Sequence, residues 1–107
     1  MTYKQTVAEE NCANMAEIRH EIDALDQEVI RLLGLRFGYV KAAAPFKSTP
    51  DEVQAQARFN SMLAQRRQWA QACGLDGAVI ENMYRDLVSW FIAQEMAHWS
   101  EQQTTSR

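Results

Sequence analysis

Hydrophobic residues recur with helical spacing from about residue 15 almost to the end of the chain. In the first stretch they are separated alternately by three and four residues, which is typical of a helix that packs along one stripe. These positions are Met15, Ile18, Ile22, Leu25, Val29 and Leu32. Asn14, with Glu17 three residues later, is a plausible N-cap. Pro45 disfavours helix in the residue before it, so we expect one helix from about Asn14 to Ala44.

Two further helices are expected after the proline-rich segment. The STPDE stretch predicts a turn in which Ser48 or Thr49 caps a second helix running from about 51 to 73. Gly74 is a candidate C-cap, and Asp76 then begins a third helix. The polar tail SEQQTTSR is expected to fray. No stretch alternates as a strand would, so the pattern predicts a single all-α domain over residues 1–107.

The lengths of these three helices are unequal. A helix of about thirty residues is about 45 Å long at ~1.5 Å per residue, whereas a compact chain of this size has a radius of gyration near ~13 Å. The first helix would therefore extend beyond its own core while still carrying an apolar stripe. We expect an intertwined homodimer of three-helix subunits.

Composition narrows the classes of partner. Lys and Arg number 11 against 14 Asp and Glu, giving a net charge of −3, so no global field attracts nucleic acid or an anionic membrane. No apolar run approaches a membrane span, and the N-terminus lacks the apolar region of a signal peptide. Cys12 and Cys73 resemble reduced thiols, and His20 and His98 have no ligand spacing. We expect a soluble, cytoplasmic protein without a metal or organic cofactor.

Two charged residues occupy positions where the pattern calls for core. Arg36 continues the stripe of the first helix, which resumes at Tyr39, Ala43 and Phe46. Glu95 lies on the apolar stripe of the third helix, whose other members are Tyr84, Val88, Phe91 or Ile92, and Trp99. An inward charge is costly unless it is paired or meets a charged ligand. Each alone has a simpler explanation, Arg36 by extending its charged end to solvent and Glu95 by pairing with a lysine or arginine, but the two together favour a binding site.

Three cations surround the proline-bounded break, namely Arg36, Lys47 and Arg58. Eleven residues return a helix to within ~20° of its start, so Arg36 and Lys47 would share a face, ~16 Å apart along the axis. Arg19 would lie ~25 Å from Arg36 and be rotated by ~100°, so it can serve this site only from a second subunit. This grouping predicts a small ligand held between the long side chains of Arg36 and Lys47.

The residues also carry a family resemblance. The segments EIRHEIDALDQEVIRLLGLRFGYV, FK, RFNSML and WFIAQEMAHW resemble the all-helical type II chorismate mutases, and within them the isochorismate pyruvate lyases. The resemblance spans roughly residues 12 to 100 and implies an intertwined dimer of three-helix subunits. It implies a cofactor-independent elimination of pyruvate from isochorismate, giving salicylate for siderophore biosynthesis, with a weak chorismate mutase side activity.

The resemblance also implies roles for individual residues. Arg19 would bind a substrate carboxylate in the partner's site, and Arg36 the other carboxylate in its own subunit. Lys47 would donate to the ether oxygen whose bond to the ring breaks, and Arg58 would lie near the substrate. Two further positions, Met62 and Ile92, would line the pocket.

One position departs from the pattern of the family, and two others bear on which reaction is catalysed. Glu95 stands where the lyases and many mutases have a glutamine that donates to the ether oxygen, and a glutamate donates only when protonated. Glu95 therefore either acts as a neutral acid or pairs with Lys47. Mutases of this fold usually have acidic residues at the positions of Ala55 and Phe59, so the apolar residues here favour the lyase. The alternatives are a chorismate mutase that forms prephenate and, from another class, a non-catalytic helical dimerisation module.

Overall fold

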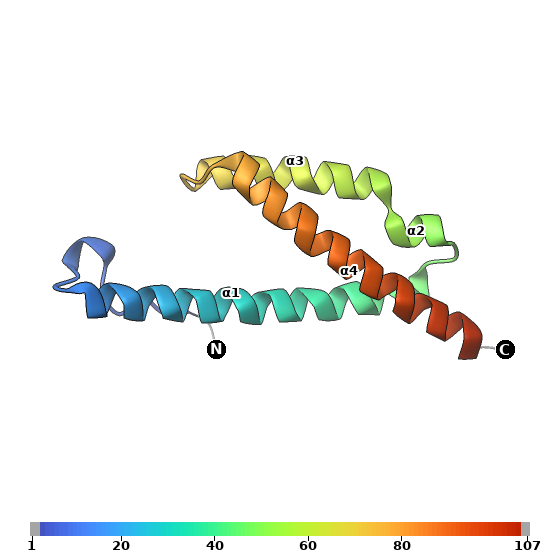
Figure 1. The fold of residues 1–107 in the computed structure, drawn as a ribbon, viewed down its shortest axis with the longest axis horizontal. Coiled ribbons are helices and arrows are strands. Elements are labelled where there is room, and N and C mark those ends of the chain that lie inside the picture. Colours follow the sequence, from blue (N-terminus) through green and yellow to red (C-terminus); the bar gives the residue numbers. More distant parts are fainter. Residues whose placement is uncertain (1–2, 106–107) are drawn as a thin grey trace. The chain divides into compact units, whose positions relative to one another are not determined.

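The computed structural model describes residues 3–105, which fall into two compact units, one up to Gly38 and one from Tyr39 onward. Four α-helices and two short 3₁₀ turns make up the described part, and no strand occurs in it (Figure 1). The elements in order are η1 (Glu9–Asn11), α1 (Met15–Ala43), η2 (Ala44–Phe46), α2 (Pro50–Gln54), α3 (Gln56–Ala72) and α4 (Gly77–Thr105). The predicted all-α class is confirmed.

The first unit consists of most of α1 and a segment that folds back on its first turns, residues 3–12, which we call the N-terminal hook (Figure 1). Glu21 of α1 holds the hook. Its Oε1 accepts from the backbone N–H of Thr6 at 3.2 Å and of Val7 at 3.0 Å, and from the Thr6 hydroxyl, while its Oε2 accepts from the Tyr3 hydroxyl at 2.8 Å. Glu21 is only 8% exposed. These hydrogen bonds lower the pKa of Glu21 to about 2 and raise that of Tyr3.

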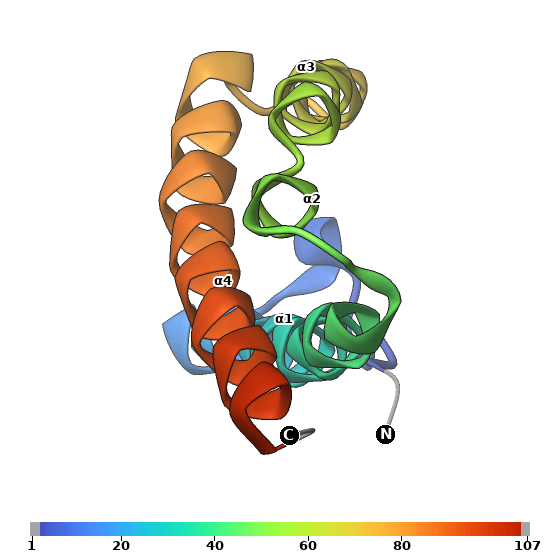
Figure 2. The ribbon, with the colours of Figure 1, turned by 90° about the vertical axis from the view of Figure 1, so that its right-hand side faces the viewer.

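The second unit is built on a helical hairpin. Figures 1 and 2 show α3 and α4 running in opposite directions from the turn that joins them, with α2 beside α4. The buried apolar side chains of the described residues all lie in this unit, namely Ala44, Val53, Met62, Leu63, Ala70, Val88 and Phe91. An ion-pair network between Arg67, Glu81 and Arg85 adds to the α3–α4 contact and lowers the pKa of Glu81.

The helix ends are capped largely as the sequence predicts. The side chain of Asn14 accepts from the N–H of Glu17 at 3.0 Å, that of Thr49 from Glu52 at 3.2 Å, and that of Asp76 from Ala78 at 2.8 Å. Gly74 adopts a φ of 78° after α3. Its N–H donates to Gln71, and the N–H of Leu75 donates to the Ala70 carbonyl, as in a Schellman motif.

The predicted second helix is interrupted at Ala55, which adopts a left-handed conformation with φ 43° and ψ 56°. The Ala55 N–H donates to the Asp51 carbonyl, and the Ala55 carbonyl accepts from Phe59, so both sides of the joint remain hydrogen-bonded. Val53 of α2, two residues before this turn, is 1% exposed. A continuous helix from 51 to 73 was therefore the wrong expectation.

Three other expectations are corrected. The tail does not fray where it is described, since α4 continues to Thr105; residues 106 and 107 lie outside the described part. The apolar stripe of the first helix does not extend to Phe46, because α1 ends at Ala43 and Phe46 lies in η2. Arg36 and Lys47 do not share a helix face, because α1 ends at Ala43 and Lys47 follows η2 in an extended conformation.

The stripe of α1 from Met15 to Leu32 is exposed along its whole length, with each of its six members between 37% and 54% exposed. Within residues 3–105 no helix is both long enough and apolar enough to cross a membrane.

Candidate functional site

The candidate site in the second unit centres on Lys47. The chain leaves η2 at this residue, with the Lys47 N–H donating to the Ala44 carbonyl at 3.1 Å and the backbone extended at φ −107° and ψ 134°. Its ammonium Nζ lies 3.0 Å from Oε2 of Glu95. The Lys47 side chain is 23% exposed and that of Glu95 only 5%. Of the two arrangements open to Glu95, the structure has the ion pair.

Glu95 is a buried charge in an apolar setting. It projects from the same face of α4 as Val88 and Phe91, which are 8% and 3% exposed. The inward position predicted for Glu95 is therefore confirmed. A carboxylate in such a place is costly unless a cation meets it, and Lys47 supplies that cation. The ion pair places a positively charged ammonium, which can donate several hydrogen bonds, at the start of the loop between η2 and α2.

Trp99 makes a second contact to Lys47. The indole Nε1–H donates to the Lys47 backbone carbonyl at 2.8 Å. Glu95 and Trp99 are four residues apart on α4, so one helical turn contacts both the end of the Lys47 side chain and its backbone. The sequence placed Trp99 on the inward stripe but gave no signal for this hydrogen bond, because it joins residues 52 positions apart.

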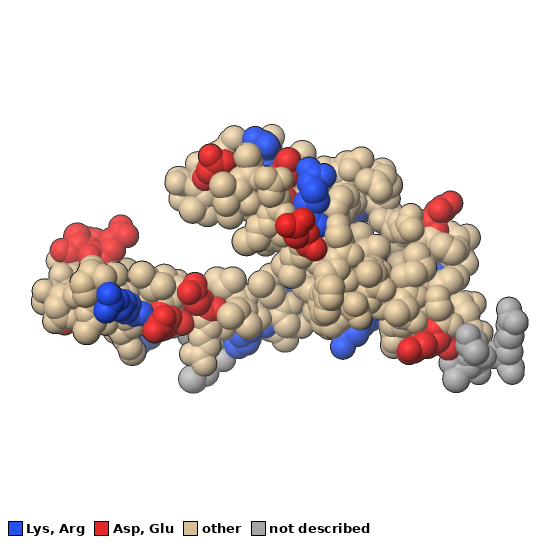
Figure 3. Space-filling model, in the orientation of Figure 1, with Lys and Arg blue, Asp and Glu red and all other residues tan. Residues whose placement is uncertain are grey.

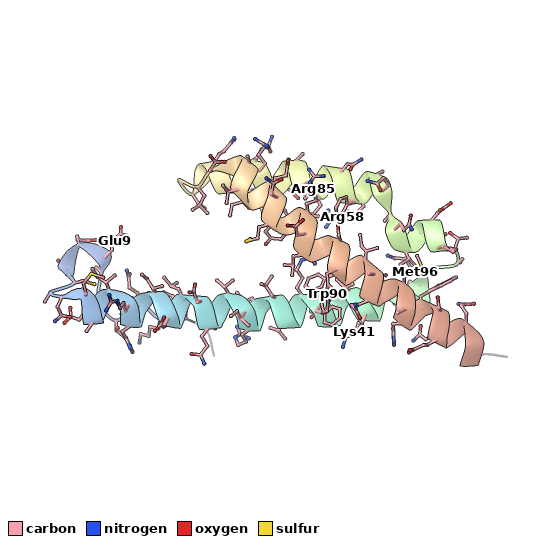
Figure 4. The ribbon with its side chains drawn as sticks, in the orientation of Figure 1. Glu9, Lys41, Arg58, Arg85, Trp90 and Met96 are labelled. Carbon is pink, nitrogen blue, oxygen red and sulfur yellow. The ribbon has the colours of Figure 1, made fainter. Side chains whose placement is uncertain are left out.

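The remaining predicted residues of this unit lie on α3 and α4. Met62 is buried at 2% exposure, and Ile92 is half-buried. Arg58 is exposed on α3 (Figure 4). A groove of about 190 Å³ lies next to this region, and its lining includes Phe59 and Ile92. Gln54, Gln56 and Ser89 complete that lining, so the groove is lined by apolar and by uncharged polar side chains.

The two candidate carboxylate-binding arginines belong to the first unit. Arg19 is exposed on α1, two residues before Glu21, whose carboxylate is occupied by the N-terminal hook. No ion pair involves Arg19 among residues 3–105. Arg36 is half-buried further along α1. The hook itself was not expected from the sequence, since its contacts depend on hydroxyl and backbone groups without a regular spacing.

Two other kinds of site receive no support. No three His, Cys, Asp or Glu side chains within the described range come together as metal ligands would. On the face drawn in Figure 3, acidic and basic side chains are interspersed, and the basic ones form no continuous stripe of the sort that follows a nucleic acid backbone.

Comparison with known proteins identifies the family. Residues 18–96 match the model of chorismate mutase type II. The chain belongs to the type II chorismate mutase family. Over 90 residues it is also 37% identical to a curated protein of Pseudomonas aeruginosa named isochorismate pyruvate lyase, an alignment that covers 84% of this chain and 89% of that protein. The resemblance inferred from sequence segments is confirmed.

The residues matched by the family model include the candidate site but not every contact described above. All seven candidate site residues, from Arg19 to Glu95, fall within residues 18–96 of this type II chorismate mutase family member. The N-terminal hook lies before this segment and Trp99 after it. The contacts that Glu21 makes to the hook, and Trp99 to Lys47, are therefore features that the family match does not itself describe.

Proposed function

We propose that this chain is an isochorismate pyruvate lyase, which eliminates pyruvate from isochorismate and leaves salicylate. The observation that carries the proposal is the 37% identity, over most of both chains, to the Pseudomonas aeruginosa protein of that name. The salt bridge between Lys47 and Glu95 supports it, because it presents an ammonium donor from a loop. Salicylate formed in this way would serve siderophore biosynthesis.

The proposed reaction is a concerted elimination. The hydrogen on ring C2 moves to the terminal methylene of the enolpyruvyl group, which becomes the methyl group of pyruvate. The ether bond between the ring and oxygen breaks, and that oxygen becomes the ketone oxygen of pyruvate. The electron pair of the C2–H bond forms the new ring double bond that gives the aromatic product. Atoms and electrons balance without an oxidant, a nucleophile or an added proton.

Catalysis would therefore rest on positioning and electrostatics. Holding the enolpyruvyl group over the ring in a reactive conformation can supply several kcal/mol of the ~7–11 kcal/mol available from orientation. Lys47 would donate to the ether oxygen, where negative charge grows as the C–O bond breaks, and such a donor contributes roughly 3–4 kcal/mol. The polypeptide around Lys47, bounded by Pro45 and Pro50, would act as the lid that closes over the substrate.

Glu95 would hold the Lys47 ammonium in place. Its carboxylate contacts one side of the ammonium at 3.0 Å, which leaves the other hydrogens for the substrate oxygen. Met62 and Ile92 would line the apolar part of the pocket, and Arg58 would approach from α3. The two carboxylates of the substrate would be bound by Arg36 and by Arg19.

The proposal includes a homodimer in which Arg19 of each subunit serves the other subunit's site. The exposed stripe on α1, with six apolar side chains between 37% and 54% exposed, supports this assembly. A second copy of α1 would offer a surface of the same character. Association through such a face is the usual way in which long helices bury an apolar stripe.

Chorismate mutase activity is the second candidate, because it is the activity for which the family is named. Ala55 and Phe59 argue against it as the main activity. Neither side chain can address the ring hydroxyl with a charge, and Ala55 stands at the joint between α2 and α3.

The test is to supply purified protein with isochorismate and, separately, with chorismate, following salicylate by fluorescence and prephenate by chromatography. Rapid salicylate formation from isochorismate is the expected result, with little or slow prephenate from chorismate. Prephenate as the main product would establish the mutase instead. If the protein forms neither salicylate nor prephenate, the enzymatic proposal is overturned.

A further inference from the structure

The hydrogen bond from Trp99 to the Lys47 carbonyl fixes a loop residue at its backbone. Lys47 lies between η2 and α2, where its extended conformation leaves the carbonyl outside the helical hydrogen-bond pattern. The Trp99 indole reaches this carbonyl at 2.8 Å from the last third of α4. The only proton that an indole can donate is thus directed at the main chain of the proposed catalytic lysine.

Lys47 is therefore held at both of its ends by a single turn of α4. Glu95 contacts the ammonium at 3.0 Å, and Trp99 contacts the carbonyl at 2.8 Å. Side chains four residues apart on a helix are neighbours, with Cβ atoms roughly 5–6 Å apart. A lysine has four side-chain torsions, so the ammonium is located accurately only if the backbone from which it extends is itself fixed.

We infer that Trp99 is a positioning residue for Lys47 and that its indole N–H, rather than its ring alone, sets the place of the ammonium in the lyase reaction. The inference rests on the proposed function. Trp99 does not touch the reacting atoms; it acts through the Lys47 backbone. Loss of this hydrogen bond should lower kcat rather than substrate affinity. The substrate carboxylates are assigned to other residues, and their binding does not depend on this hydrogen bond.

The Trp99 side chain contributes both the packing of its ring and the hydrogen bond of its N–H, and the test must separate the two. The ring is half-buried, so its removal alters packing whatever the N–H does. The two contributions are separated by replacing Trp99 with 3-benzothienylalanine, which has sulfur in place of the N–H and nearly the same shape. Trp99→Phe provides a genetically encoded variant that also lacks the donor. Trp69→Phe is the matched control, because Trp69 is 53% exposed on α3 and its ring packs 4.5 Å from the Arg66 guanidinium.

The experiment measures kcat and KM for isochorismate, salicylate affinity and thermal stability for the four proteins. Loss of one neutral hydrogen bond changes a rate constant that depends on it by about five- to tenfold. We therefore expect kcat of the benzothienylalanine protein to fall by at least that factor. KM and salicylate affinity should stay within about twofold of wild type. The Trp69→Phe protein should match wild type. An unchanged kcat in the benzothienylalanine protein, or equal losses of kcat and affinity, would overturn the inference.

A second readout does not depend on the reaction. The rate of reductive methylation of Lys47, followed by mass spectrometry relative to the exposed Lys4, should rise several-fold when the Trp99 N–H is removed. If the wild-type protein forms no salicylate, the protein without the Trp99 N–H can still show faster methylation of Lys47 than wild type. In that case the proposed function fails and the positioning contact stands. An unchanged methylation rate contradicts the contact, whatever the activity.

Discussion

The ammonium of Lys47 and the carboxylate of Glu95 lie 3.0 Å apart, one on the loop after η2 and the other on a buried face of α4. The carboxylate is the more deeply buried partner, so the lysine approaches it from the solvent side. An incoming anion therefore meets the ammonium first. This order suits a donor that must be available to substrate and yet remain in one place.

Replacement of Lys47 tests its role as the donor to the ether oxygen. We expect Lys47→Ala to lower kcat by roughly 10²–10³, the loss typical of removing one transition-state donor, with a much smaller loss of salicylate affinity. Steady-state kinetics with isochorismate and fluorescence titration with salicylate provide the two measurements. Arg36→Ala is the contrasting variant and should mainly abolish binding. Equal losses of turnover and affinity in Lys47→Ala would contradict the assignment.

Glu95 can be tested with a conservative and a severe change. In Glu95→Gln the amide oxygen can still accept from the Lys47 ammonium, so we expect kcat to remain within about tenfold of wild type. Glu95→Ala leaves the Lys47 ammonium without its partner. Its kcat should fall further than that of the glutamine variant, because the cation is then no longer fixed in position. Kinetics of the two variants side by side give the ranking. Similar activity in all three proteins would remove Glu95 from the site.

The proposed contribution of Arg19 from each subunit to the other subunit's site predicts complementation. Arg19→Ala and Arg36→Ala proteins should each be nearly inactive alone. A mixed dimer would contain one site with both arginines and one with neither, so a fully exchanged equal mixture should regain about one quarter of wild-type activity. Activity is measured after the two proteins are unfolded together and refolded, with each variant refolded alone as the control. No recovery, with dimers present by light scattering, would place both arginines in one subunit's site.

Glu21 makes the N-terminal hook sensitive to acid. Its pKa is lowered from 4.5 to about 2 in the folded protein, chiefly by hydrogen bonds from Thr6 and Tyr3. The folded state therefore binds fewer protons than the unfolded state, and the contribution to stability is complete above pH 4.5 and is lost as the pH falls towards 2. Hydrogen exchange of the Val7 amide should accelerate over this range relative to an amide of α3. In Glu21→Gln the acceleration should be absent, and its persistence there would implicate another group.

Gly77 starts α4 where that helix touches α3. A Cβ on Gly77 would lie 2.7 Å from Cγ of Arg67 and 3.3 Å from the Arg67 carbonyl oxygen. We expect Gly77→Ala to destabilise the protein by about 1–3 kcal/mol, as overpacking does. Gly34→Ala is the matched control: its Cβ meets nothing within 4 Å inside α1, and alanine should stabilise the helix by roughly 0.5–1 kcal/mol. Denaturant unfolding of both variants measures the difference, and equal effects would contradict the steric explanation.

Helices and caps were predictable because they depend on near neighbours in the chain. The spacing from Met15 to Leu32 identified α1, and Asn14, Thr49 and Asp76 act as the caps that their positions indicate. The inward placement of Glu95 followed from the same periodicity. Contacts between distant residues were less accessible. Pairing of Lys47 with Glu95 was one of two alternatives, and the hydrogen bond from Trp99 left no trace in the sequence.

The break at Ala55 shows where local reasoning fails most clearly. Nothing in PDEVQAQAR marks a joint, because alanine is a strong helix former. The left-handed conformation of Ala55 accompanies the burial of Val53, and such a tertiary contact is not encoded in the helix preference of a single residue.

The same joint limits which mutations the protein can accept on the way to a new activity. A left-handed backbone is open to glycine, asparagine and aspartate but strongly disfavours valine, isoleucine and threonine. Aspartate, one of the two acidic residues, is thus among the few that the backbone at 55 tolerates. A library randomised at this codon should return folded clones rich in glycine, asparagine and aspartate, leaving the evolutionary route between the two reactions open at the level of the backbone.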